Sequence, residues 1–248
     1  MSLDPPRRED VAGPADRNKP TWLIVNADDF GCCHGVNRGI IEAHEHGIVT
    51  SASLMVDARG AVDAAEYARE RAELGVGLHV VLERWRVHRL PRRGSTFSAR
   101  ALERHAAGQL ERQLEQFSLL VGRSPTHLDS HQHRHTWPLV QPLFERAASE
   151  LGVPLRRTDL GARFCGEFYG HDGRGRPDPE AIRPEALINL LERLEPGLTE
   201  LCCHPGYADD LDSWYRLERE QEIRALCDPR VQETVQKRGI RLCTFSDA

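Results

Sequence analysis

The sequence predicts a single-domain α/β protein with about seven mainly parallel strands, in a sheet that is either open or closed into a barrel. Short apolar, β-prone runs alternate along the chain with stretches of helical periodicity, which is the pattern of consecutive βα units. The length of 248 residues and the hydrophobic content of 40% suffice for one sizeable core. These observations favour one continuous domain.

The expected strands are short apolar runs that polar or turn-forming residues follow. The first run, WLIVNA at residues 22–27, is apolar apart from its asparagine, as expected of a strand buried on both faces. The seven expected strands cover residues 22–27, 51–56, 76–82, 126–129, 153–156, 199–203 and 240–245. Because helical stretches separate most of them, neighbouring strands are expected to run parallel.

The expected helices have apolar residues at intervals of three or four. The clearest covers residues 99–121, where Leu110, Leu114, Phe117 and Val121 repeat at this spacing. Other helices are expected at 35–45, at 61–71, after Pro138, from Pro184, and as two segments within 214–238. A segment dense in Gly, Pro and Arg, residues 161–179, is expected to form a long loop.

Composition excludes several function classes. The 33 basic and 38 acidic residues are mixed along the chain, with a formal net charge of −5, so neither a nucleic-acid stripe nor a polybasic membrane patch is expected. No apolar run approaches the length of a membrane span. Seven cysteines without regular spacing are typical of reduced thiols in a cytoplasmic protein.

The first twenty residues differ in composition from the rest of the chain. Residues 1–20 hold four prolines among charges and no apolar segment of the kind a signal peptide needs. They are expected to form a disordered leader. The folded domain is then expected to cover residues 21–248.

The most informative segment is the run HLDSHQHRH, which places four histidines and an aspartate within nine residues. Imidazole and carboxylate form the ligand set of a divalent transition metal, and a metal with open positions activates water and polarises a carbonyl. His131 is the favoured ligand. His127 and Asp129 share its face by the period of two and are expected to orient imidazoles. His133 and His135 are ligand candidates or, equally, solvated loop residues.

Three further segments offer partners for this cluster. Asp28 and Asp29 follow the first strand, where the alternative is a polar turn ending at a glycine. His79 lies late in the third strand, where the alternative is a hydrogen-bonded core histidine. His204 directly follows the sixth strand and is a candidate general acid, although an incidental histidine in a turn is the simpler interpretation.

All these candidates lie at the carboxyl ends of expected strands, which is where parallel α/β proteins build their sites. Two adjacent carboxylates suit a division of labour, in which one binds metal and the other accepts a proton from water. We therefore expect Asp28, Asp29, His79, His131 and His204 to meet at one mouth of the sheet. The sequence thus indicates a metal-dependent hydrolase.

Together these motifs resemble the YdjC/ChbG family of carbohydrate deacetylases. The similar segments appear in the family's order and are spread from about residue 22 to residue 245. They are IVNADDFG at 24–31, GVNRGI at 35–40, GIVTSASLM at 47–55, GLHV at 77–80, PTHLDSHQH at 125–133 and CHPGY at 203–207. The combination is specific, whereas any one segment alone is a weak signal.

The resemblance implies a distorted (β/α) barrel, and hydrolysis of the N-acetyl group of an amino sugar or a chitin-type oligosaccharide. It places one divalent metal on Asp29, His79 and His131. It makes Asp28 the base and, by analogy with other sugar deacetylases, His204 the acid that protonates the leaving amine. The apolar stretch 80–85 departs from the family, whose members often carry Asn or Thr there.

Contacts to the sugar are expected from the long loop and from tryptophans. Arg163, Glu167 and Tyr169 offer hydrogen-bonding groups for hydroxyls, and Trp137 or Trp85 offers a ring for stacking. For the metal, nitrogen and oxygen ligands fit zinc or magnesium first and leave cobalt, nickel and manganese open. The sequence does not identify the acetylated sugar, and it leaves a homo-oligomer open.

Two other function classes remain. Histidine and aspartate clusters on barrels also cleave phosphate esters, which makes a metal-dependent phosphoesterase the first alternative. The second is a non-catalytic sugar-binding protein on the same fold. Loss of the base or the acid would favour it, but Asp28 and His204 are both present.

Overall fold

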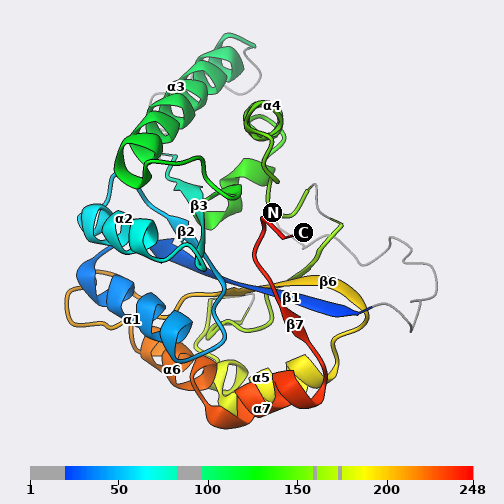
Figure 1. Cartoon of the computed structure of the whole chain (residues 1–248). Coiled ribbons are helices and arrows are strands. Elements are labelled where there is room, and N and C mark those ends of the chain that lie inside the picture. The colour runs from blue at the N-terminus through cyan, green and yellow to red at the C-terminus, as the bar shows by residue number, and fades with distance from the viewer. Residues whose placement is uncertain (1–19, 83–95, 159–160, 173–174, 248) are drawn as a thin grey trace.

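The computed structural model describes residues 20–82, 96–158, 161–172 and 175–247. Most of the expected leader at 1–20, and Trp85, lie outside the described residues. Within them, a curved sheet of seven strands is surrounded by helices, and all strand pairings are parallel (Figure 1). The strand order is β4-β3-β2-β1-β6-β5, with β7 added beside the start of β1.

The first strand is the centre of the sheet, because it pairs with three others. Its ten residues form β1, Thr21–Phe30, and eight of them are buried. The other strands are β2 Ser51–Leu54, β3 Gly75–Val80, β4 Leu128–Ser130, β5 Arg163–Cys165, β6 Gly197–Cys203 and β7 Arg241–Leu242. The apolar runs of β1 and β3 are therefore buried on both faces, as the sequence predicts.

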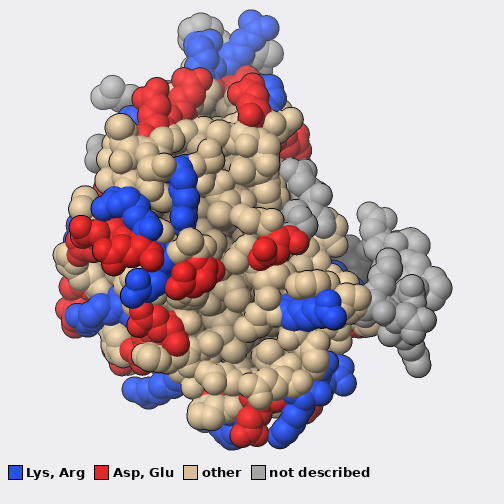
Figure 2. Space-filling model, in the orientation of Figure 1, with Lys and Arg blue, Asp and Glu red and all other residues tan. Residues whose placement is uncertain are grey.

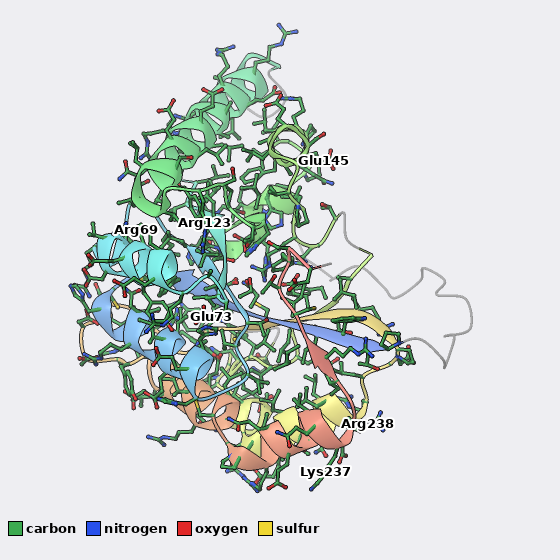
Figure 3. The ribbon with its side chains drawn as sticks, in the orientation of Figure 1. Arg69, Glu73, Arg123, Glu145, Lys237 and Arg238 are labelled. Carbon is green, nitrogen blue, oxygen red and sulfur yellow. The ribbon has the colours of Figure 1, made fainter. Side chains whose placement is uncertain are left out.

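The helices follow the predicted periodicity. Apolar side chains at three- and four-residue spacing face the sheet, as Val36, Ile40 and Ala43 do in the first helix. The helices are α1 His34–Glu45, α2 Ala61–Glu70, α3 Thr96–Val121, α4 Gln141–Leu151, α5 Pro184–Glu192, α6 Leu217–Leu226 and α7 Pro229–Lys237. Figure 3 labels Arg69, Glu145 and Lys237, which are exposed side chains of α2, α4 and α7.

One strand prediction and one loop prediction were wrong. The strand expected at 153–156 forms only an isolated bridge between Leu155 and Leu128. Pro154 has no N–H to donate, and Arg157 has a left-handed φ of 67°, so the extended run cannot continue. Instead β5 lies inside the segment expected to be loop, where it pairs with residues 199–201 of β6.

The surface agrees with the mixed composition. Acidic and basic side chains are interspersed on the face that Figure 2 shows, and neither sign gathers into a stripe. Among the described residues, no helix combines the length and apolar character that crossing a bilayer requires. All seven cysteines are free.

Candidate active site at the carboxyl ends of the strands

A cavity of about 390 Å³ opens where β1 and β6 end. Its polar lining includes the two adjacent aspartates and three of the candidate histidines. The residues that line it are Asp28, Asp29, His131, Gln132, His133, Arg157, Phe164, Gly166, Phe168, Tyr169, Cys202, His204, Ser213, Trp214, Tyr215 and Arg219. A second depression, which Glu73 and Arg123 help to line (both labelled in Figure 3), lies near the start of β3, away from these groups.

The backbone at the end of β1 sends the two aspartates in different directions. The register with β2 slips between Ala27 and Phe30, and Asp29 takes a left-handed φ of 69°, which is uncommon for a residue other than glycine. Asp28 consequently reaches Arg156 and approaches His204, whereas Asp29 faces two histidines. Such local strain is typical of functional sites.

Asp29, His79 and His131 come together around one point. The Asp29 Oδ1 atom lies 3.1 Å from His131 Nδ1 and 3.5 Å from His79 Nε2. One ligand atom from each residue lies within 4.8 Å of the other two. His79 is buried, whereas His131 is 40% exposed and lines the cavity. Two imidazoles and a carboxylate at the edge of a cavity fit a divalent transition metal with open positions.

Asp129 fixes the ring of His79. The register of β3 and β4 pairs these two residues, and Asp129 Oδ1 accepts a hydrogen bond from His79 Nδ1 at 2.8 Å. A carboxylate can only accept, so Nδ1 carries the proton and Nε2 faces Asp29. His127 shares a neighbour with Asp129, because Ser53 Oγ lies 2.9 Å from both side chains. His127 does not reach the cavity.

Arg156 is a charged residue that the sequence interpretation missed. It is fully buried, and its guanidinium pairs with Asp28 at 2.7 Å and also with Asp129 and Glu200. One cation thus holds three buried carboxylates in place. A signal was present, because Arg156 ends an expected strand just as the candidate ligands do.

Arg219 is the second missed cation. It comes from α6, is buried, and donates to Asp29 Oδ2 at 2.6 Å, so Oδ1 is the oxygen that faces the histidines. No sequence signal marks Arg219, because charged helix residues normally face solvent. The ion pair restricts how Asp29 can turn toward a ligand.

Opposing charges set the protonation of the buried groups. Burial raises the pKa values of Asp28 and Asp29, but Arg156 together with His79 and His204 lowers that of Asp28, and Arg219 together with His131 and His79 lowers that of Asp29. Both carboxyls therefore end below their usual range. Burial also opposes charge on His79, but Asp129 and Asp29 raise its pKa well above the usual range. The negative potential that holds a proton on His79 is equally suited to attract a cation.

His204 lines the same cavity, on the side of Asp28. Its Nε2 is 3.9 Å from Asp28 Oδ2, and its backbone N–H donates to Glu222 of α6. Burial lowers the pKa of His204 to about 4, although Asp28 and Asp29 oppose this shift. The ring is therefore neutral at neutral pH.

The two other histidines of the cluster differ. His135 is fully buried, with Nδ1 3.0 Å from Ser130 Oγ and Nε2 3.1 Å from the Arg156 carbonyl, so its interpretation as a solvated loop residue was wrong. His133 lines the cavity, and burial lowers its pKa to about 4. Both rings lie outside the Asp29, His79 and His131 group.

The expected sugar contacts are only partly brought to the cavity. Tyr169 lines it, but Arg163 donates to the backbone at Glu195, and the exposed Glu167 pairs with Arg193 at 3.3 Å. Trp137 is 53% exposed and does not line the cavity. Trp214 and Tyr215 also line it and were missed, because they fall within the helical segments expected at 214–238, whereas α6 begins only at Leu217.

Comparisons with known proteins agree with this geometry. Residues 22–237 match the family model described as YdjC-like protein. A carbohydrate deacetylase of Geobacillus stearothermophilus is 38% identical over 250 residues, which cover 92% of this chain and 98% of the relative. A chitooligosaccharide deacetylase of Serratia marcescens is 35% identical over 254 residues, which cover 91% and 98%.

Solved structures share the fold. A proposed cellobiose-phosphate cleavage protein from Enterococcus faecalis V583 has a TM-score of 0.73 at 25% identity, over 92% of this chain and 98% of its own. The Bc1960 peptidoglycan N-acetylglucosamine deacetylase has a TM-score of 0.56 at 12% identity, over 94% and 89%. These likenesses confirm the predicted single-domain α/β class with an incompletely closed parallel barrel.

Proposed function

Because the chain belongs to the YdjC-like protein family, we propose that it is a metal-dependent deacetylase that removes the N-acetyl group from an acetylated amino sugar or a chitin-type oligosaccharide. One observation carries the proposal. A carboxylate and two imidazoles meet at one side of the cavity, and a second carboxylate with a third imidazole lies beside them. These are the groups that amide hydrolysis needs.

Asp29, His79 and His131 are the residues proposed to hold the metal. Among the described residues, two other groups have metal-ligand spacing and are less suited. One relies on the Cys202 thiol, whose pKa burial raises well above its usual range, and the other is entirely buried. When bound, a divalent metal supplies Lewis acidity, which lowers the pKa of water and polarises a carbonyl. Zinc, magnesium, cobalt, nickel and manganese are all to be tested.

Asp28 is proposed as the general base. Its lowered pKa keeps the carboxylate ionised at neutral pH, so it is free to take a proton. Arg156 and Asn26 both donate to Oδ1, at 2.7 and 2.9 Å, which leaves Oδ2 on the side of His204. Asp28 then removes a proton from the water that attacks the acetamide carbon.

His204 is proposed as the general acid, and its low pKa determines where its proton comes from. Before the reaction the neutral ring cannot act as an acid, because it lacks the second proton of the imidazolium. Its Nε2 atom lies 3.9 Å from Asp28 Oδ2. The proton that Asp28 takes from water can pass to His204 and then to the amine nitrogen as the C–N bond breaks. Acetate and a free amino sugar are the products.

The decisive experiment measures acetate and phosphate release from one panel of acetylated amino sugars and phosphate esters. Acetate release alone supports the proposal. Phosphate release alone supports the phosphoesterase alternative, for which the name of the Enterococcus faecalis neighbour is a reason to include a cellobiose phosphate. Sugar binding without either product supports the non-catalytic alternative.

Metal removal tests the cofactor separately. Dialysis against a chelator should abolish acetate release, and adding back one of the five ions should restore it. Metal content is measured alongside activity. Full activity in protein whose metal content is shown to be negligible contradicts the metal-dependent part of the proposal and leaves the deacetylase part standing.

A further inference from the structure

Four aromatic side chains form a continuous row beside the cavity, and all but His171 line it. We call this row, made of Tyr169, His171, Trp214 and Tyr215, the aromatic wall. Tyr169 and Tyr215 stack at 4.7 Å with their planes 10° apart, and His171 packs against Trp214 at 4.6 Å. None of these rings belongs to the groups assigned above to metal binding or proton transfer.

The wall runs from His204 to the cavity mouth. The His204 ring lies 5.3 Å from Tyr169 and 5.9 Å from Tyr215, and Tyr215 lies 5.9 Å from Trp214. Exposure rises along the row, from 3% at Tyr215 to 69% at Trp214. The sugar that carries the leaving amine must lie near His204, so whatever is attached to that sugar is directed along the wall.

The wall is held in place by polar contacts on its far side. The Tyr215 hydroxyl accepts from the Gly170 backbone N–H at 2.8 Å and donates to Glu222. His171 Nε2 lies 3.1 Å from Glu218 of α6. A ring that is already held in place loses little conformational entropy when a ligand packs on it. Trp214, which packs against other rings of this wall, can therefore bind a ligand at a small entropic cost.

We propose that Trp214, backed by His171, is a stacking subsite for a second pyranose ring, next to the acetamido sugar that reacts beside His204. The inference rests on the proposed function and narrows its substrate to oligosaccharides of at least two rings. An exposed indole at the lip of a cavity offers a flat apolar face with an N–H at its edge, which suits the C–H face and hydroxyls of a sugar.

The kinetic test compares Trp214→Ala with Trp137→Ala, which removes an equally large exposed ring outside the cavity. Trp214→Ala should raise KM for N,N′-diacetylchitobiose about five- to tenfold, with kcat nearly unchanged and N-acetylglucosamine hardly affected. Trp214→Phe should retain most of the affinity, and Trp137→Ala should behave as wild type. Equal losses on both sugars, or equal losses in both alanine variants, would overturn the subsite.

A second measurement does not depend on catalysis. The β-1,4-linked glucosamine disaccharide, which carries no acetyl group, should change the tryptophan fluorescence of wild type and of Trp137→Phe but not of Trp214→Phe. An unchanged signal in wild type, or a signal that survives in Trp214→Phe, contradicts the subsite. If wild type releases no acetate from any sugar, the proposed function fails, while this titration still decides the subsite.

Discussion

The floor and the mouth of the cavity hold their side chains in different ways. On the floor, Asp28, Asp29 and Asp129 are nearly fully buried and pair with Arg156 or Arg219. At the mouth, the aromatic wall ends in a largely exposed indole that packs against two neighbouring rings. Removing one partner of a buried ion pair leaves an uncompensated charge and strongly destabilises the site. Truncating an exposed ring is expected to cause a smaller loss of binding or stability.

The largest effect is expected at the proposed metal site. His131→Ala should lose stoichiometric metal and acetate release together, because it removes one of the three proposed ligands. His133→Ala is the matched control, since His133 also lines the cavity but lies outside the ligand group. Metal content after dialysis measures both. An equal loss of metal affinity in the two variants would show that the wrong histidine was chosen.

The next effect separates the two adjacent aspartates. Asp28→Asn keeps its shape but cannot accept a proton, so kcat should fall about 10²–10⁴-fold while metal stays bound and KM changes little. Asp29→Asn should instead weaken metal binding, with some activity recovered by excess metal. Metal titrations of both variants that gave the reverse pattern would exchange the two roles, and two fully active variants would remove both from the chemistry.

The difference between floor and mouth also explains what the sequence could predict. Parallel strands end at one edge, so strand assignment alone was enough to expect Asp29 and His79 near one another. Arg156 also ends an expected strand, but its pairing with Asp28 is long-range, as is the pairing of Arg219 with Asp29, and no local pattern records either pairing. A short strand in glycine-rich sequence lacks periodicity, which is why β5 was missed, and Trp214 falls within a segment expected to be helical, whereas the helix begins only at Leu217.

The third prediction concerns Glu222, which joins floor to mouth by accepting from the His204 N–H and the Tyr215 hydroxyl. Burial raises its pKa to about 7 from the usual 4.5. Between these pH values Glu222 binds more protons in the folded state than in the unfolded state, so its own contribution to stability falls by about 3 kcal/mol as pH rises through that window. Buried histidines such as His204, whose pKa is lowered, contribute in the opposite direction. Glu222→Gln should remove this part of the pH dependence.

Urea unfolding at pH 5 and pH 8 measures the effect in wild type and in the variant. Glu220→Gln, which removes a charge from the same helix, should keep the wild-type dependence. If the free energy of unfolding of Glu222→Gln changes between pH 5 and pH 8 as much as that of wild type, Glu222 does not titrate in this window.

The smallest expected effect tests how rigidly the floor holds a ligand. Asp129 accepts from His79 Nδ1 and also pairs with Arg156, so a change there acts on the ring and on the cation. Asp129→Asn should lower Zn²⁺ affinity about 10–100-fold, because the uncharged amide orients the imidazole less firmly and makes it a weaker donor. Glu200→Gln is the matched control. Glu200 also pairs with Arg156, but among the described contacts it makes no hydrogen bond to His79. Competition with a chelating dye measures both affinities. If the two variants lose Zn²⁺ affinity equally, the loss is due to the disturbed ion pairs of Arg156. If only Asp129→Asn loses affinity, the loss is due to the missing charge beside the His79 ring.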